Sequence, residues 1–231
     1  MRTTKMKKFL RIILLYTPLL LIGLSVLWVV ALKWIPVVRT PLMDIRAREY
    51  RGDDSYKFRK HWVKLEDISD NLVLAVMSSE DSRFLDHKGF DRVEIRKALD
   101  EKKSGKRVRG ASTISQQTAK NVFLTPRRTV IRKVLEAYFT VLIENIWGKR
   151  RIMEVYLNVA EFGKGVYGAE AAAKLYFDKP ASTLSARESA MLAACLPSPL
   201  KRNPARPSDY LRQRCSKIQG LMRQVARPEW L

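Results

Sequence analysis

TVIRKVLEAYFTVLIENIW, residues 129–147, is a strongly apolar segment with helical spacing. Apolar residues fall on nearly every side of a helix built from it, a pattern typical of a buried helix. Its polar residues recur every three or four positions and form one stripe, made of Arg132, Lys133, Glu136, Thr140 and Glu144. A buried helix rarely carries charges unless they are paired or line a polar cleft. Two interpretations stay open: a surface ion pair between Arg132 and Glu136, or an active-site groove lined by Glu136 and the two bases.

Helical spacing recurs on both sides of this segment, whereas the period-two alternation of strands is scarce. Helices are predicted over residues 68–79, 114–123, 151–160, 184–196 and 210–225. The sequence therefore predicts a mainly α fold. It divides into a basic flank (1–11), an apolar span (12–32), a connector with two prolines (33–54) and one domain (55–231).

Residues 12–32, IILLYTPLLLIGLSVLWVVAL, contain no charged side chain. As a helix they would match the hydrocarbon thickness of a bilayer. The flank before them has five basic residues and no acid, so the positive-inside rule keeps it in the cytoplasm. A cleavable signal peptide would have a shorter apolar region ending in small residues, whereas Trp28, Trp34 and Ile35 crowd this end. We expect a retained single-pass anchor with the catalytic part on the far side.

The chain of 231 residues has a net charge of +21, and its 46% hydrophobic content is enough for a core. Global disorder is excluded on that ground, and two cysteines cannot make a multi-disulfide scaffold or a zinc site. The strong positive charge requires an anionic partner. Because the soluble part would lie beyond the membrane, we expect anionic membrane lipids and a phosphorylated substrate, and no nucleic acid. Whether Cys195 and Cys215 pair stays open.

Four acids and a histidine crowd SEDSRFLDHKGFD, residues 79–91, directly after a predicted helix. A carboxylate at the end of such a helix can be partly buried, which raises its pKa toward the range of a general base. The alternative is a solvated loop in which His87 and Asp91 cap local backbone.

A second polar segment is GASTISQQTAKN, residues 110–121. Thr113 and Gln116 have capping-box spacing, so a helix should begin here and present free N–H groups to an anion. Gln117 and Lys120 follow one turn later and add donors and a charge. The segment predicts a phosphate cradle, although it is no Walker loop; the alternative is an ordinary capped helix.

Two further segments need an interpretation. Residues 92–109 hold eight basic and three acidic side chains, which predicts a polar, mobile loop that touches lipid headgroups or a diphosphate, or is simply solvated. GKGVYG, residues 163–168, matches the dinucleotide fingerprint letter for letter. We reject that site because the preceding run reads as a helix and no βαβ alternation surrounds it, and expect a glycine-rich turn between helices.

Taken together these segments resemble the peptidoglycan glycosyltransferase family, which includes the transglycosylase domain of class A penicillin-binding proteins. The likeness covers residues 60–205 and consists of EDSRFLDHKGFD, GASTISQQTAKN, RKVLEAYFTVLIE, RIMEVYLNVAEFGKGVYGAEAAAKLYF and ESAMLAACLPSP, in the family's order. The signatures of a penicillin-binding domain are not assembled after it. The chain is therefore most similar to the monofunctional biosynthetic transglycosylases of the family.

The resemblance implies a lysozyme-like α-helical head lobe and a smaller, membrane-apposed jaw lobe. It implies polymerisation of lipid II into β-1,4-linked glycan strands with release of undecaprenyl diphosphate, at the inner membrane with the domain in the periplasm. Glu80 would be the general base, and Glu136 the second essential carboxylate, at the donor side. The positions that match the family's substrate-binding residues are Asp81, Phe84, His87, Thr113, Gln117, Lys120, Asn121, Arg132 and Lys133.

One departure concerns LPSP, residues 196–199, where many bifunctional relatives carry a lysine, so that contact is left unassigned. No metal-ligand spacing is clear, and the sequence leaves open both a divalent ion such as Mg²⁺ and protein partners from cell-wall synthesis or division.

Two other functions are alternatives: a membrane-anchored muramidase, which would need a general acid, and a non-enzymatic protein that binds anionic lipid or the wall. A diphosphate leaving group needs cations but little acid, which favours the transferase.

Overall fold

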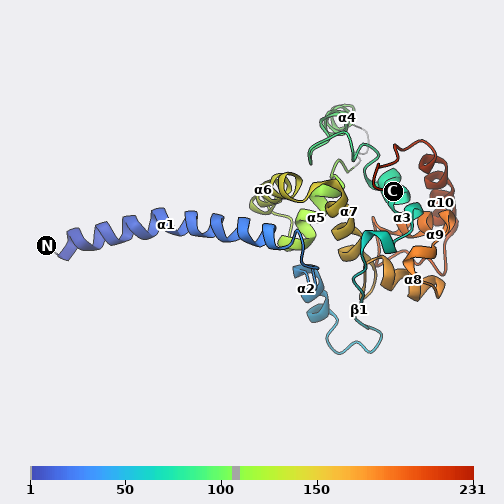
Figure 1. Ribbon diagram of the computed structural model, residues 1–231, viewed down its shortest axis with the longest axis horizontal. Helices are drawn as coiled ribbons and strands as arrows, with labels where there is room; N and C mark the ends of the chain where they lie inside the picture. The colour runs from blue at the N-terminus through green and yellow to red at the C-terminus, as the bar shows by residue number, and fades with distance from the viewer. Residues whose placement is uncertain (1, 106–109) are drawn as a thin grey trace. The chain divides into compact units, whose positions relative to one another are not determined.

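The computed structural model describes residues 2–105 and 110–231, with side chains at residue 14 and from residue 16 onward. The chain divides into two compact units, Met1–Ile35 and Pro36–Leu231. The first contains helix α1 (Arg2–Ala31), drawn in blue in Figure 1. Among the described residues, no helix combines the length and the apolar character needed to cross a membrane. The predicted span, 12–32, begins in a part of α1 whose side chains lie outside the described residues.

The second unit is mainly helical, as predicted (Figure 1). Its helices are α2 (Pro41–Glu49), α3 (Asp70–Glu80), α4 (Arg92–Lys103), α5 (Ile114–Phe123), α6 (Val130–Ile146), α7 (Gly148–Val159), α8 (Ala169–Phe177), α9 (Ala186–Cys195) and α10 (Asp209–Met222), with 3₁₀ turns η1 (Leu65–Asp67) and η2 (Ala181–Thr183). The six predicted helices of this unit correspond to α3, α5, α6, α7, α9 and α10, and α5 has the predicted bounds.

The expected loop over residues 92–109 is wrong for its first two thirds, which form α4. Asp91 accepts hydrogen bonds from the backbone N–H groups of Val93 and Glu94, and Lys102 and Lys103 lie at the negative end of the helix dipole. The rest of that expectation, residues 106–109, lies outside the described residues. Within the predicted connector, Thr40 caps α2 and Pro41 occupies its first turn, so residues 36–54 belong to the compact unit.

Three short strands form one sheet in the order β1-β3-β2. β1 (Arg59–Lys60) runs parallel to β3 (Val166–Tyr167), and β2 (Glu161–Gly163) runs antiparallel to it. The GKGVYG segment therefore makes a hairpin between α7 and α8, which explains its glycines without a nucleotide. A Cβ at Gly163 would lie 2.1 Å from the Tyr176 hydroxyl, and one at Gly168 would lie 2.8 Å from the Asn158 carbonyl oxygen.

The core lies where α3 packs on α9 and α10, and where α5 packs on α6 and α7. Its largest fully buried side chains include Tyr156, Tyr167, Phe84 and Phe162. These helices bring the C-terminal end of α3, the N-terminal end of α5 and one face of α10 together around a cleft. The fold thus assembles the first two polar segments of the sequence at one place.

α6 is not the buried helix that its composition predicts. Its buried residues are Glu136, Phe139, Thr140 and Ile143, the face that packs against α5. Five of its apolar side chains are exposed, with Val130 at 81% and Ile131, Val134, Leu135 and Val141 between 42% and 74%.

Cys195 and Cys215 are both buried and free, and their positions on the helices keep them apart. The thiol of Cys215 lies 3.5 Å from the carbonyl oxygen of Arg187, near the beginning of α9. Cys195 is the last residue of that helix, eight positions later and therefore roughly 12 Å along its axis. A disulfide needs much closer α-carbons, so this arrangement excludes one.

Gly89→Ala should destabilise the domain, because Gly89 has a φ of +87° and an added Cβ would lie 2.6 Å from Thr140 Cγ2 on α6. We expect a loss of roughly 2–4 kcal/mol in the free energy of unfolding, measured by chemical denaturation of the detergent-solubilised chain. Gly52→Ala is the matched control, because Gly52 has a φ of +84° and open space around it. It should cost about 1 kcal/mol, from backbone strain alone. Equal losses would contradict the packing argument.

Candidate active site

Glu80 is the last residue of α3 and lines the cleft. Its Oε2 accepts a hydrogen bond from Gln117 Nε2 at 3.1 Å, and its Oε1 accepts one from Ser79 Oγ at 3.3 Å. Burial raises the pKa of Glu80, while the Gln117 hydrogen bond and the positive charges of Arg214 and Arg202 oppose that rise. Because its pKa is raised, the ionised carboxylate of Glu80 is a stronger base than that of an ordinary glutamate, as a general base requires.

Gln117 is itself held from the other side by Tyr156 of α7. The Tyr156 hydroxyl donates to Gln117 Oε1 at 3.3 Å. Tyr156 is 1% exposed, and its burial raises the pKa of the phenol well above its ordinary value, so the hydroxyl keeps its proton. The amide oxygen of Gln117 therefore faces Tyr156, and its NH₂ group faces the carboxylate.

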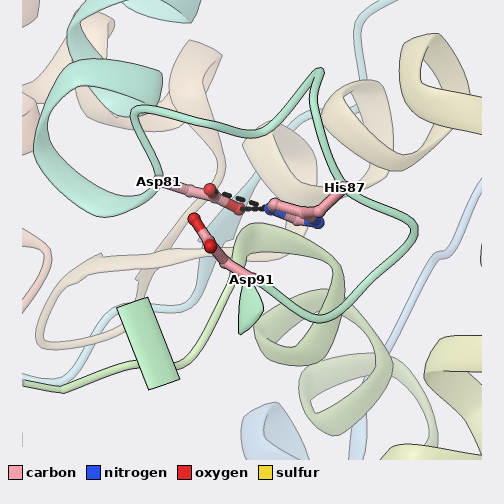
Figure 2. Close-up of side chains that lie close together, drawn as sticks. All are labelled: Asp81, His87 and Asp91. Carbon is pink, nitrogen blue, oxygen red and sulfur yellow. Dashed lines mark hydrogen bonds and ion pairs between the residues drawn. The ribbon is translucent and has the colours of Figure 1, made fainter. Parts of the chain in front are cut away.

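Directly after Glu80, the buried side chain of Asp81 joins three segments. Figure 2 shows His87 pointing at it, with Nε2 at 3.0 Å and 3.1 Å from the two carboxylate oxygens. His87 Nδ1 accepts the backbone N–H of Gly89, so the imidazole proton sits on Nε2 and is donated to Asp81. Asp81 Oδ2 also accepts the backbone N–H of Ile114, the first residue of α5, at 3.0 Å. The end of α3, the 81–91 loop and the start of α5 are thereby fixed together.

Asp81, His87 and Asp91 place ligand-type atoms within 4.8 Å of one another. Figure 2 shows the three side chains lying close together. These atoms are already engaged, because Asp81 accepts the two hydrogen bonds above and Asp91 Oδ1 caps α4. Asp91 Oδ2 lies 3.3 Å from the guanidinium of Arg83. Mg²⁺ requires free oxygen ligands in octahedral geometry, and a neighbouring cation repels it. The cluster does not fit a Mg²⁺ site and acts as a polar support beneath Glu80.

At the start of α5 the predicted capping box between Thr113 and Gln116 is confirmed. The predicted phosphate cradle of free N–H groups is wrong. The N–H of Ile114 is donated to Asp81, and that of Gln116 to Thr113 Oγ1. The positive end of this helix dipole therefore faces a carboxylate of the protein itself.

A second carboxylate, Glu136, lies on the buried face of α6 and is 3% exposed. It forms ion pairs with Arg132 and Lys133 on the same helix. Lys120 of α5 belongs to the same cluster: burial lowers the pKa of Lys120, Glu136 raises it, and Arg132 and Lys133 lower it. Glu80 also raises the pKa of Lys120, so both carboxylates act electrostatically on this lysine. The Arg132–Glu136 ion pair expected from sequence exists, and it is part of a cationic cluster rather than a surface pair.

The cleft beside Glu80 has a volume of about 600 Å³. One wall is α10, an element to which sequence reasoning gave no functional role. It contributes Arg214, Lys217, Ile218 and Leu221, and Arg214 Nη2 donates to Ser79 Oγ at 3.3 Å. In the sequence, the only indication of this role was that Arg214 and Lys217 lie on one side of a predicted helix. Solvated charges on a surface helix commonly show the same spacing.

The remaining predicted residues take different places. Phe84 is fully buried and meets the His87 ring edge-on at 6.4 Å, so it packs beneath the loop. Thr113 donates its hydroxyl to the carbonyl oxygen of Gly89 at 2.7 Å, which also fixes the loop. Asn121 follows Lys120 on α5 and is half-buried. The structure thus brings Glu80, Gln117 and Lys120 together in the site and places Phe84 and Thr113 in its support.

The family model described as Transglycosylase matches residues 48–223. The chain belongs to the transglycosylase family. It is 50% identical over 202 residues to the biosynthetic peptidoglycan transglycosylase of Bacteroides thetaiotaomicron, covering 87% of this chain and 82% of that protein. It is 49% identical to the protein of that name from Caulobacter vibrioides (92% and 90% covered) and 51% identical to the one from Rhodospirillum centenum (90% and 89%). Transglycosylases of this family are glycosyltransferases, and the matched range includes both carboxylates and the cleft.

Asp81→Ala should destabilise this transglycosylase domain, because two buried donors, the His87 Nε2–H and the Ile114 N–H, would lose their acceptor. We expect a loss of roughly 2–4 kcal/mol in the free energy of unfolding, measured by chemical denaturation. Asp86→Ala removes a carboxylate from the same loop that is exposed and 3.9 Å from Arg83, and should cost less than about 0.5 kcal/mol. Similar losses for the two variants would contradict the role assigned to Asp81.

Proposed function

We propose that this chain is a peptidoglycan glycosyltransferase that polymerises lipid II into β-1,4-linked glycan strands and releases undecaprenyl diphosphate. The names of its relatives and the family match support this function. The observation that carries it is the position of Glu80, a carboxylate whose pKa burial raises and which lines an open cleft, near the cationic cluster of Lys120, Arg132 and Lys133.

In the reaction, Glu80 removes the proton from the 4-hydroxyl group of the acceptor sugar. The oxygen attacks the anomeric carbon of the growing strand, and the bond from that carbon to the diphosphate oxygen breaks. The electron pair leaves with the lipid diphosphate, and the single displacement inverts the α-linkage into a β-1,4 bond. The acceptor occupies the cleft wall formed by α10, where Arg214 and Lys217 face it.

The donor side is the cluster of Lys120, Arg132 and Lys133. Its positive charge stabilises the diphosphate as negative charge builds up on it, and such a leaving group needs no proton. Glu136 forms ion pairs with two of these cations and so fixes where their charge lies. A muramidase would instead need a carboxylic acid to protonate a sugar oxygen. Glu136, bound by two cations, is arranged as an anion, which favours the transferase.

We also propose a membrane-bound arrangement. Residues 12–32 form a single-pass anchor with a cytoplasmic flank, and the domain lies in the periplasm at the inner membrane. The exposed apolar face of α6 lies against lipid, as does α4, whose exposed residues include Val93 and Leu99 among basic side chains. These two helices belong to the jaw lobe, and the remaining core forms the lysozyme-like head. Anionic headgroups complement the net positive charge, and partners from cell-wall synthesis would meet the enzyme there.

Glu80→Gln should abolish polymerisation of purified lipid II by the detergent-solubilised chain, with at least a roughly hundredfold loss of rate and an unchanged unfolding transition. Glu66→Gln is the matched control, because Glu66 is an exposed glutamate on η1 paired with Arg150. It should keep wild-type activity. The assay is run with and without a divalent chelator, which reports any metal requirement.

Normal glycan chains from the Glu80→Gln variant would overturn the base assignment. Soluble muropeptides released from finished peptidoglycan would identify a muramidase. Wild-type function in cells of both Glu80→Gln and Glu136→Gln would identify a non-enzymatic binding protein.

The membrane arrangement predicts the labelling of single introduced cysteines by an impermeant thiol reagent in intact cells. A cysteine at Ser182, exposed on η2, should react, and one at Thr4 in the flank should not react until the membrane is opened. A cysteine at Val134 on the apolar face of α6 should stay unlabelled because lipid covers it. Labelling at Thr4 in intact cells would contradict the topology, and labelling at Val134 as fast as at Ser182 would contradict the lipid contact.

A further inference from the structure

We propose that Tyr156 is a positioning residue for the transfer reaction, acting through Gln117 to hold the reactive carboxylate of Glu80 in its proton-accepting state. This inference rests on the proposed role of Glu80 as the base. Tyr156 comes from α7, the other side of α5, and does not line the cleft.

Tyr156, Gln117 and Glu80 are joined in a row by two hydrogen bonds, one from the tyrosine hydroxyl to the amide and one from the amide to the carboxylate. A carboxylate only accepts hydrogen bonds, so Gln117 stabilises it with its NH₂ group and destabilises it with its carbonyl oxygen. A glutamine amide can present either end by rotating half a turn. What decides between the two ends is the group on the far side of Gln117.

That group is the Tyr156 hydroxyl. Within the part of the chain that the structure describes, its hydrogen-bond partner is Gln117 Oε1. The ring is 1% exposed, so no bulk water can replace this acceptor. If the amide rotated, the buried O–H would lose its acceptor and the amide oxygen would face a carboxylate. Both consequences are unfavourable, and the hydroxyl therefore selects the orientation in which NH₂ faces Glu80.

Other groups also act on Glu80, and they come from several elements. The donors and charges that face it are Ser79 on α3, Arg214 on α10, Arg202 after α9 and Lys120 on α5. The guanidinium of Arg202 is anchored separately, by the carbonyl oxygen of Ala194 and the ring of Tyr210, and Arg214 bonds to Ser79. None of these described interactions involves Tyr156. Removing its hydroxyl should therefore change one contact of Glu80, the hydrogen bond from Gln117.

The consequence has a definite sign. The Gln117 hydrogen bond lowers the pKa of Glu80 against the rise caused by burial. Losing it raises that pKa further, so a larger fraction of the base is protonated at a given pH. The rate then falls at low pH and recovers at high pH, where Glu80 is ionised in either case.

The test is Tyr156→Phe in the full, detergent-solubilised chain, with the rate of lipid II polymerisation measured against pH. We expect the acid limb to move up by about half a unit to one unit, which is a roughly three- to tenfold loss below the limb and near-normal rates well above it. Tyr167→Phe is the matched control, because Tyr167 is a fully buried tyrosine on β3 beside Glu161. It should leave the limb where it is.

A double-mutant cycle tests the route through Gln117. Gln117→Ala should move the acid limb in the same direction, and adding Tyr156→Phe to it should move the limb no further. A further shift in the double variant would show that Tyr156 acts by another route and would overturn the proposal. A loss of the same factor at every pH, with the limb unmoved, would show that the hydroxyl serves folding alone and would also overturn it.

A second measurement separates this inference from the proposed function. The carboxyl band of Glu80 can be identified in infrared titrations as the band missing in Glu80→Gln. Tyr156→Phe should move its midpoint to higher pH whether or not the chain polymerises lipid II. An unmoved midpoint overturns the positioning role, whereas a moved midpoint in a chain without polymerase activity overturns only the proposed function.

Discussion

The carboxylate of Asp81 is the interaction on which the site depends. It accepts a hydrogen bond from His87 and another from the first backbone N–H of α5, so the end of α3, the loop that follows it and the start of α5 meet at two oxygen atoms. Glu80 is its covalent neighbour, and the position of the proposed base is therefore set by a carboxylate that also lines the cleft but is engaged by hydrogen bonds within the protein. The same carboxylate occupies the positive end of the α5 dipole, so the proposed diphosphate site lies further along that helix, at Lys120.

The two proposed catalytic glutamates differ through their surroundings. Glu80 is half-buried beside neutral donors, with arginines acting on it through space, and its partial burial raises its pKa. Glu136 is buried in direct ion pairs with Arg132 and Lys133. One carboxylate is thus suited to take up a proton and the other to organise cations, a division set by environment rather than by residue type. Lys120 is influenced by both, so the two halves of the site are electrostatically connected.

The sequence predicted those features of the fold that depend on residues close together along the chain. The capping box of Thr113 and Gln116 predicted where α5 begins, and the apolar spacing predicted six helices of the domain, because these signals depend on neighbours along the chain. It missed α4, because the high charge density of the segment favoured a loop even though capping of local backbone by Asp91 was one of the alternatives. It could not show that Asp81 fills the start of α5, that α6 packs on one side alone, or that Arg214 reaches Ser79. Each of these depends on a partner more than thirty residues away or on a surrounding outside the domain.

Burial protects the two cysteines of this chain from oxidation. Each is buried, and burial raises the pKa of the Cys195 thiol to about 12, so the reactive thiolate is scarce. Cys195 ends α9, whereas Cys215 of α10 lies against the carbonyl oxygen of Arg187 near the beginning of α9, so the two cannot reach each other. In an oxidising compartment such as the one proposed here, a newly exported chain meets enzymes that introduce disulfides. Folding before that encounter hides both sulfur atoms, and for this protein the speed of burial decides whether mispaired, cross-linked species form.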